Sequence, residues 1–277
     1  MSSGQTQSDK VTTVRIVRKK AKAERIVCLT AYDYPSALIL DEAGVDLILV
    51  GDSAANVIYG MPTTLTIGMD EMVYHTRAVV AGVKRALVVA DMPFLSYQVS
   101  VEQAVANAGR FLKAGAEAVK VEGAGPVVPA IRRLVELGIP VMGHLGLTPQ
   151  SVHRLGGYRL QARKTEDAER LLADAHELED AGCFSIVLEK IPAEVAAKVT
   201  RELRIPTIGI GAGPNCDGQV LVLHDMLGMF DTTPLKFVKQ YAQLAGEIRK
   251  AVASYADEVR AGKFPGEEHT FHVDKPQ

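Results

Sequence analysis

The sequence has few cysteines, almost no net charge and no long apolar run. Its 277 residues contain 31 lysines and arginines against 33 aspartates and glutamates, a formal net charge of −2. A chain this close to neutral creates no overall field that would hold nucleic acid or an anionic membrane by non-specific attraction. We therefore expect small-molecule partners, no nucleic acid and no membrane. A short basic run between Arg15 and Arg25 is interrupted by apolar residues and is better explained as an exposed helix than as a nucleic-acid arm.

The cysteines exclude two further classes of protein. Cys28, Cys183 and Cys216 form no CxxC pair and are odd in number, so neither a disulfide framework nor a zinc knuckle is indicated. Residues 1–10 are polar, and no apolar run approaches the length of a membrane span. We expect a cytoplasmic protein that is neither secreted nor inserted into a membrane.

A repeated pattern indicates the fold. Five successive short apolar runs each follow a helical stretch and a glycine, and each ends at a polar residue; the glycines are Gly44, Gly82, Gly115, Gly138 and Gly182. Glycine can take the left-handed conformation that stops a helix, and apolar runs that do not alternate are typical of parallel strands buried on both faces. Similar runs at residues 26–30, 206–210 and 219–223 bring the expected strands to about eight.

The segments between these runs have helical patterns. The clearest begins at Ser100, which forms a capping box with Gln103, and another follows Thr165. Strands and helices that alternate over this length predict an α/β fold, a (β/α)8 barrel of the TIM type, with an open doubly wound sheet as the alternative. We expect a flexible leader at residues 1–14, a single barrel domain at 15–262 that ends in a long helix over 233–260, and a tail at 263–277.

Charged side chains lie at the ends of the predicted strands. In a parallel barrel the loops after the strands converge on one mouth, where functional residues gather. These residues are Asp52, Asp91, Lys120, Glu122, His144 and Glu189. A single acid at a strand end is more often a helix cap, but four acids and a histidine around one mouth indicate a site. Facing carboxylates raise one another's pKa unless a cation neutralises them, so a hard, oxygen-liganded ion such as Mg²⁺ is predicted.

Three features of this mouth have two interpretations each. Lys120 either pairs with a neighbouring acid or binds a substrate carboxylate; by strand alternation it points to the same side as Glu122. His144 either contacts the substrate or a ligand, or makes a hydrogen bond in the core. The glycines between Gly209 and Gly213 either cradle a phosphate or allow close backbone packing, and the second is favoured because the GxGxxG and P-loop patterns are absent.

Several segments resemble the ketopantoate hydroxymethyltransferase family. The resemblance runs from about Arg15 to beyond Phe230. The matching segments are LTAYDYP at 29–35, VGDS at 50–53, DMPF at 91–94, KVEG at 120–123, GHLGLTPQS at 143–151, GIGAG at 209–213, GQVLV at 218–222 and HD at 224–225. The GHLGLTPQS segment is the most specific of them.

The resemblance implies a barrel of the phosphoenolpyruvate/pyruvate type and transfer of a hydroxymethyl group from 5,10-methylenetetrahydrofolate to 3-methyl-2-oxobutanoate. The product is 2-dehydropantoate, on the route to pantothenate and coenzyme A. By matching position, Asp52 and Asp91 would bind Mg²⁺, with Glu122 as a further or water-mediated ligand, and the ion would stabilise an enolate. The keto acid would be surrounded by Asp52, Ser53, Asp91 and Lys120. Glu189 would accept the proton, and the family forms homo-oligomers, commonly decamers.

One segment departs from the family. After Val-Gly-Asp-Ser the family usually continues with Leu-Gly-Met, whereas this chain has Ala54, Ala55 and Asn56, which puts the backbone path beyond Ser53 in question. Two other functions are considered. A Mg²⁺-dependent lyase of the same barrel type generally has a Lys-Cys-Gly loop, which this chain lacks, and a non-catalytic metabolite-binding barrel would not need the full set of acids.

Overall fold

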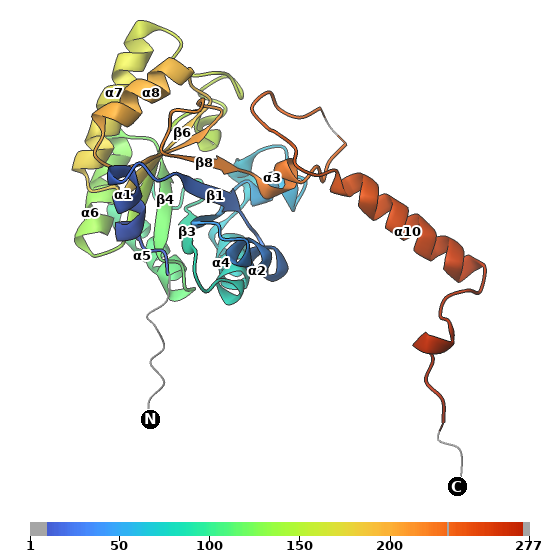
Figure 1. Cartoon of the computed structure of the whole chain (residues 1–277). Coiled ribbons are helices and arrows are strands. Elements are labelled where there is room, and N and C mark those ends of the chain that lie inside the picture. Colours follow the sequence, from blue (N-terminus) through green and yellow to red (C-terminus); the bar gives the residue numbers. More distant parts are fainter. Residues whose placement is uncertain (1–9, 232, 274–277) are drawn as a thin grey trace. The chain divides into compact units, whose positions relative to one another are not determined.

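The computed structural model describes residues 10–231 and 233–273. Eight parallel strands close into a barrel in chain order, with helices around it (Figure 1). The barrel confirms the predicted TIM-type fold and excludes the open sheet. The strands are β1 (Ile26–Thr30), β2 (Leu47–Val50), β3 (Leu87–Asp91), β4 (Ala118–Glu122), β5 (Val141–Gly146), β6 (Ser185–Glu189), β7 (Thr207–Ile210) and β8 (Gly218–Leu221).

The helices begin and end close to the expected glycines and caps. At Ser100, the side chain accepts a hydrogen bond from the backbone N–H of Gln103 at 3.1 Å, which is one of the two bonds of the predicted capping box. The α-helices are α1 (Thr13–Ala21), α2 (Tyr34–Glu42), α3 (Ala54–Val57), α4 (Met69–Gly82), α5 (Val101–Lys113), α6 (Val128–Glu136), α7 (Thr165–Asp180), α8 (Ala193–Glu202), α9 (Leu223–Met226) and α10 (Leu244–Arg260). The 3-10 turns are η1 (Thr64–Thr66), η2 (Gly125–Val127), η3 (Pro149–Ser151) and η4 (Glu267–His269).

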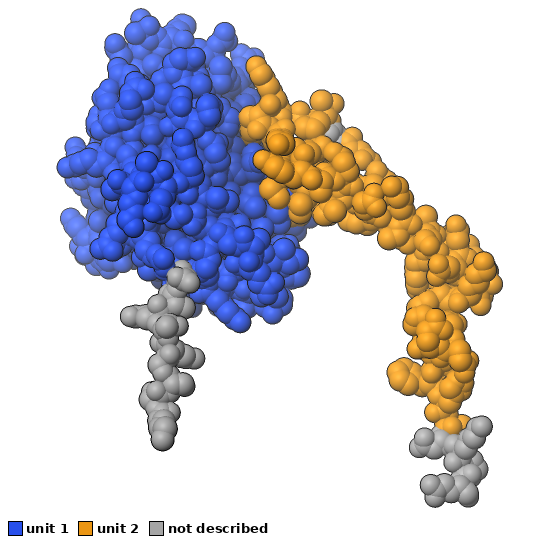
Figure 2. Space-filling model, in the orientation of Figure 1, with its two compact units in different colours: residues 1–223 blue, residues 224–277 orange. Residues whose placement is uncertain are grey.

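The chain divides into two compact units, residues 1–223 and residues 224–277 (Figure 2). The first contains all eight strands. The leader expected at 1–14, the domain at 15–262 and the tail at 263–277 stay predictions, and residues 1–9 and 274–277 lie outside the described part. Val11 is buried, and its backbone N–H donates to the carbonyl of Arg85 at 2.8 Å. None of the helices described could span a bilayer, since each is too short or too polar.

The interior of the barrel changes from apolar to charged along β3, β4, β5 and β6. Every strand contributes to one buried apolar cluster that includes Ile26, Leu47, Leu87, Ala118, Met142, Val187, Ile208 and Val220. Successive side chains of a strand point to opposite faces, so residues two apart share a face. On β3, Leu87 and Val89 belong to this cluster and Asp91 follows two residues later. The inward-facing side chains of β3 therefore extend from the apolar core to the charged mouth.

Helix α1 differs from the exposed helix that the basic run predicts. Ile16 is fully buried and joins the apolar cluster of the barrel. The ammonium of Lys19 lies 2.9 Å from a carboxylate oxygen of Asp46, and that of Lys20 lies 2.9 Å from Asp217, residues that precede β2 and β8. The helix thus closes the end of the barrel opposite the mouth, and part of its basic run is paired rather than solvated.

The last helix is shorter than expected, because α10 begins at Leu244 rather than near 233. The backbone N–H groups of Tyr241, Leu244 and Ala245 donate to the carbonyls of Met226, Leu227 and Gly228. These hydrogen bonds replace the i to i−4 bonds of a helix, so the segment before Leu244 packs as a loop on the turn after α9. The sequence pattern alone could not show this competition.

Gly82 also differs from its predicted role. It ends α4 without a left-handed conformation, unlike Gly44, Gly115, Gly138 and Gly182. A Cβ atom at Gly82 would lie 2.7 Å from the carbonyl oxygen of Tyr34 and 2.9 Å from the backbone nitrogen of Leu38. Glycine is therefore needed here for the close approach of α2 and α4, and not to stop the helix.

Candidate active site

Five of the six charged residues expected at the mouth lie on inward positions of neighbouring strands, and Asp52 follows β2. Asp91, Glu122 and Glu189 are the last residues of β3, β4 and β6. Strand β5 extends to Gly146, because its pairing with β6 continues to Glu189, so His144 lies within the strand rather than beyond its end. This corrects the shorter strand expected from the sequence. His144 is opposite Glu122 in the register of β4 and β5.

Lys120 lies among the acids of the mouth. Its ammonium nitrogen is 2.7 Å from Oδ1 of Asp91 and 3.5 Å from Oε1 of Glu122, and these side chains are at most 4% exposed. The contact with Glu122 confirms that both side chains point to the same face of β4. The ion pairs expected if Lys120 only pairs with neighbouring acids are present. A substrate carboxylate would therefore have to share the ammonium with Asp91 and Glu122 or take the place of one of them.

His144 bridges two carboxylates. Its Nδ1 lies 3.1 Å from Oε1 of Glu122, and its Nε2 lies 3.3 Å from Oε2 of Glu189. Nδ1 is also 3.2 Å from the ammonium of Lys120. A carboxylate can only accept, so a protonated imidazole donates from Nδ1 to Glu122, while Nε2 forms an ion pair with Glu189 but no hydrogen bond among the described residues. The Glu189 side chain is 16% exposed against 3% for His144, which makes Glu189 the more accessible end of this row.

Asp52 and Ser53 follow β2. The backbone N–H of Asp52 donates to Oδ2 of Asp91 at 3.2 Å, and the Ser53 hydroxyl is 2.8 Å from the hydroxyl of Tyr32. The chain then forms the helical turn α3, in which Ala54 and Ala55 are fully buried. Alanine takes this conformation readily, so the departure from the family pattern needs no glycine here.

Burial and repulsion keep the aspartates from ionising freely. Burial raises the pKa of Asp52 well above its usual value, and the carboxylates of Asp91 and Glu122 raise it further. Burial also raises the pKa of Asp91, although the ammonium of Lys120 acts in the opposite direction. These two carboxylates therefore lack sufficient positive charge around them.

The other members of the cluster are charged. Burial opposes ionisation of Glu122, but Lys120 and His144 outweigh it and lower its pKa. For Lys120, burial is outweighed by the three neighbouring acids, so its pKa is raised. Burial and the Lys120 charge act against a charged His144, but the charge and hydrogen bond of Glu122 and the contact with Glu189 raise its pKa to about 9. His144 is therefore a cation at neutral pH.

The donor set of this cluster fits a hard cation. Asp52 and Asp91 offer oxygen ligands, both are almost fully buried, and both have raised pKa values that a bound cation would offset. In the described part of the chain, no group of three or more His, Cys, Asp or Glu side chains is arranged so that it could hold a metal ion. Mg²⁺ commonly uses one or two carboxylates with water and substrate, so an incomplete set is compatible with it.

Two buried residues of the mouth, Tyr97 and Gln150, had no predicted role. The Gln150 side-chain amide donates to Oδ2 of Asp52 at 3.0 Å, and its backbone N–H donates to Oε2 of Glu122 at 3.0 Å. The Tyr97 hydroxyl lies 2.8 Å from Oε1 of Gln150. Gln150 belongs to the GHLGLTPQS segment, so that motif was the available signal; Tyr97 had none.

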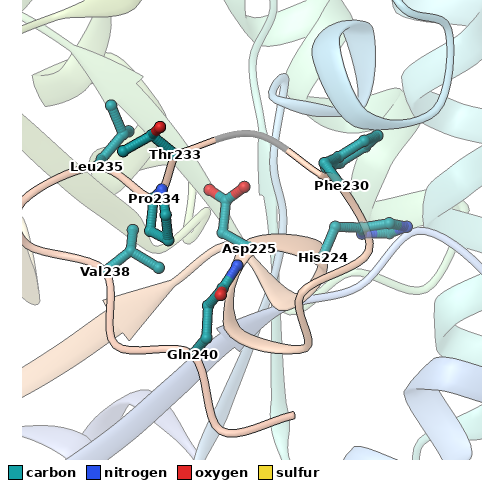
Figure 3. A pocket seen from close by; sticks show the side chains of 8 residues that line it. All are labelled: His224, Asp225, Phe230, Thr233, Pro234, Leu235, Val238 and Gln240. Atoms are coloured by element: carbon teal, nitrogen blue, oxygen red, sulfur yellow. The ribbon is translucent and has the colours of Figure 1, made fainter. Parts of the chain in front are cut away.

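Two other features lie outside this cluster. At Gly213 an added Cβ would lie 2.5 Å from the Cβ of Ala193, which favours close packing over a phosphate cradle for this glycine segment. A separate hollow of about 360 Å³ is formed by residues 224–277 alone (Figure 3); none of the predicted site residues lines it. Its walls are His224, Asp225, Phe230, Thr233, Pro234, Leu235, Val238 and Gln240.

Comparison with known proteins identifies the family. The model of the family "Ketopantoate hydroxymethyltransferase" matches residues 10–267. A relative from Moorella thermoacetica, named 3-methyl-2-oxobutanoate hydroxymethyltransferase, is 56% identical and covers 96% of this chain and 99% of its own length. A relative of the same name from Nitratidesulfovibrio vulgaris is 57% identical, with 96% and 87% covered.

Solved structures support the fold. A phosphonopyruvate hydrolase has a TM-score of 0.62 at 11% identity, with 95% of this chain and 92% of that chain covered. A 2,3-dimethylmalate lyase of the PEP mutase/isocitrate lyase superfamily has a TM-score of 0.58 at 17% identity, with 94% and 89% covered. These identities carry the fold alone. The family model and the far more similar relatives show the family: the chain belongs to the ketopantoate hydroxymethyltransferase family.

Proposed function

We propose that this chain transfers a hydroxymethyl group to 3-methyl-2-oxobutanoate and forms 2-dehydropantoate, with 5,10-methylenetetrahydrofolate as the donor. The donor supplies the methylene carbon, water supplies the hydroxyl oxygen, and tetrahydrofolate leaves. The observation that carries the proposal is the row of buried charged side chains from Asp91 through Lys120, Glu122 and His144 to Glu189, at the mouth of a barrel of this family.

Asp52 and Asp91 would hold Mg²⁺, with Glu122 as a further ligand, directly or through water. When bound, the ion supplies the positive charge that acidifies the carbon next to the ketone and favours the enolate. The raised pKa values of both aspartates support this assignment, because they indicate carboxylates that lack a sufficient counter-charge. Ser53 would line the keto acid beside Asp52.

Lys120 would bind the carboxylate of the keto acid. Its ammonium is buried, and a buried charge is costly unless it is paired. The Asp91 carboxylate lies 2.7 Å from this ammonium. If that carboxylate rotated toward a bound metal ion, the ammonium would be available to the substrate. Lys120 would thus hold the anionic end of the substrate.

Glu189 would remove the proton from the substrate carbon. It ends β6, and its contact with Nε2 of His144 orients the carboxylate at the more exposed end of the charged row. A positioned carboxylate is a suitable general base for a proton of lowered pKa. The cation of His144 lies between Glu122 and Glu189, and its Nε2, which forms no hydrogen bond within the part of the chain that the structure describes, would donate to the substrate.

The expected partners are the two small-molecule substrates and further copies of this chain, as a homo-oligomer for which the family resemblance implies a decamer. A cytoplasmic location is supported by three buried free thiols. Burial raises the pKa of Cys183 to about 12 and raises those of Cys28 and Cys216. None of them is a reactive thiol, which argues against a lyase that uses a catalytic cysteine.

Product identification tests the proposal. The purified protein would be incubated with both substrates, with Mg²⁺ and with a chelator in its place, and the product identified by NMR and mass spectrometry. We expect 2-dehydropantoate only when both substrates and the metal are present. Cleavage of a carbon–carbon bond without the folate would favour the lyase instead. A folded protein that binds the keto acid but forms no product would favour a non-catalytic binding barrel.

A further inference from the structure

We infer that Gln150 is a positioning residue: its side-chain amide holds the Asp52 carboxylate in the orientation that the site uses. The inference rests on the proposed function and concerns the same site. Gln150 lies in η3, directly after β5, and is 5% exposed. From there its side chain reaches the ends of β2 and β3.

All hydrogen-bonding positions of the Gln150 amide are used. The nitrogen Nε2 donates to Oδ2 of Asp52 at 3.0 Å and to the carbonyl of Met92 at 2.9 Å. The oxygen Oε1 accepts from the Tyr97 hydroxyl at 2.8 Å and from Nε2 of Gln98 at 3.2 Å. A flipped amide would place its oxygen against a carboxylate and a carbonyl, which can only accept, so this orientation is determined.

Tyr97 fixes the amide from the other side. The backbone N–H of Glu122 donates to the Tyr97 hydroxyl oxygen at 3.1 Å. The single proton of that hydroxyl has two acceptors, Oε1 of Gln150 at 2.8 Å and the carbonyl of Glu122 at 3.3 Å, and the shorter contact is with Gln150. A directed chain of donors therefore runs from the backbone of β4 through the phenol and the amide to Asp52.

This chain matters because Asp52 has no cation as close as Lys120 is to Asp91. Its nearest charged neighbours include Asp91 and Glu122, both of which repel it. The Lys120 charge and the hydrogen bond from the Gln150 amide both offset this repulsion, and the amide also selects one carboxylate orientation. Groups that orient a metal ligand in this way typically contribute a factor of about 10 to 100 in metal affinity. Gln150 would therefore act through Asp52 and not on the substrate.

The test compares Gln150→Met with Gln219→Met. Both changes keep the length of the side chain and remove an amide donor, but Gln219 is exposed on β8 and donates to the carbonyl of Gly213 at 3.0 Å. Binding of Mn²⁺, used as a paramagnetic probe of the Mg²⁺ site, would be measured by EPR without substrates. We expect Gln150→Met to weaken binding by roughly 10- to 100-fold and Gln219→Met to leave it unchanged.

A kinetic readout separates positioning from damage to the fold. Saturating Mg²⁺ should restore most of the turnover of Gln150→Met, whereas a distorted barrel would not recover. If that variant does not fold, Tyr97→Phe removes only the phenol oxygen and should weaken Mn²⁺ binding in the same direction.

Suppose that the wild type binds Mn²⁺ and forms product, and that a folded Gln150→Met, or Tyr97→Phe in its place, binds the ion equally well. The positioning role of Gln150 would then be wrong, and the proposed function would stand. A wild type that neither binds the ion nor forms product would overturn the proposed function as well.

Discussion

Single residues at the mouth differ in what balances their charge. Lys120 and His144 are cations between carboxylates, whereas Asp52 receives a hydrogen bond from a neutral amide and the Lys120 charge only as a weaker influence than burial and its acidic neighbours. Carboxylates outnumber the cations, and the imbalance falls on Asp52 and Asp91, whose pKa values are raised. The two residues proposed to bind the metal are therefore the ones whose ionisation would gain most from it.

Glu189→Gln should abolish proton removal while substrate and metal still bind. The change keeps the shape of the side chain and its place at the end of β6 but removes its basicity. We expect turnover to fall by roughly 10²-fold or more, the usual scale for a lost general base. The direct measurement is exchange of the C3 proton of the keto acid with deuterated water, followed by NMR without the folate. Full retention of the wild-type exchange rate in the variant would mean that another residue removes the proton.

Lys120→Ala should affect the keto acid and the stability of the fold together. The change leaves Asp91 and Glu122 buried without their cation, which typically costs about 3 to 5 kcal/mol of unfolding free energy. It also removes the proposed partner of the substrate carboxylate. We expect the KM for the keto acid to rise well above that for the folate donor in variants that remain folded. Equal increases for both substrates would favour a purely structural ion pair.

At the scale of elements, the sequence predicted what depends on local patterns. Strand positions followed from the glycine and apolar runs, and alternation correctly placed Lys120 and Glu122 on one face. Prediction from the sequence failed where the structure depends on contacts between distant segments. The start of α10 is set by hydrogen bonds to residues 226–228, and the burial of α1 depends on Asp46 and Asp217 at the base of the barrel. Gln150 reaches Asp52 only once the barrel is closed.

Asp41 at the end of α2 should be a strong contributor to stability. Its carboxylate accepts hydrogen bonds from the backbone N–H groups of Lys84, Arg85 and Ala86, which connect α4 to β3. Asn at this position retains one acceptor oxygen and loses the charge. We expect Asp41→Asn to lower the free energy of unfolding by about 1.5 to 3 kcal/mol in urea titrations. The control is Asp180→Asn, whose exposed side chain is 4.0 Å from Arg204, with an expected change within about 0.5 kcal/mol.

The pH dependence of this contribution has a definite sign. Burial opposes the charge of Asp41, but the three backbone donors and Arg85 outweigh it and lower its pKa. A lowered folded-state pKa gives stability that is present above the unfolded pKa of about 3.9 and is lost as the pH falls through the folded value. The difference in stability between wild type and Asp41→Asn should therefore shrink on acidification below that range. A difference that stayed constant into strong acid would contradict the assignment.

On the scale of the whole molecule, the proposed oligomer has a candidate contact in α10. Ile248, Val252, Tyr255 and Val259 repeat at intervals of three and four, and all are exposed at 45% or more. None of the residues of this helix is buried within the chain. An apolar stripe at this spacing is the kind of surface that a second copy covers.

Val252→Lys should therefore shift the assembly toward smaller species in sedimentation velocity, because it places a charge in the middle of the stripe. The barrel itself should keep its circular dichroism, since this helix belongs to residues 224–277. Ser254→Lys adds the same charge on the other side of the helix and should leave the assembly unchanged. Identical sedimentation of the wild type and both variants would exclude this stripe as a contact between copies.

The closure of the barrel has a consequence for how a cell makes this protein. Strand β1 pairs with β8, and Lys20 of α1 pairs with Asp217, which is 197 residues away in the chain. At synthesis rates of about 5 to 20 residues per second, the ribosome adds the residues between these partners in roughly 10 to 40 s. During that time β1 has an unpaired edge, and such edges template pairing with other nascent chains. Pairing with β2 does not cover this edge, because β2 lies along the opposite side of β1. Exposure of the edge during translation, unless a chaperone protects it, should therefore limit the yield of folded protein more than the stability of the finished barrel does.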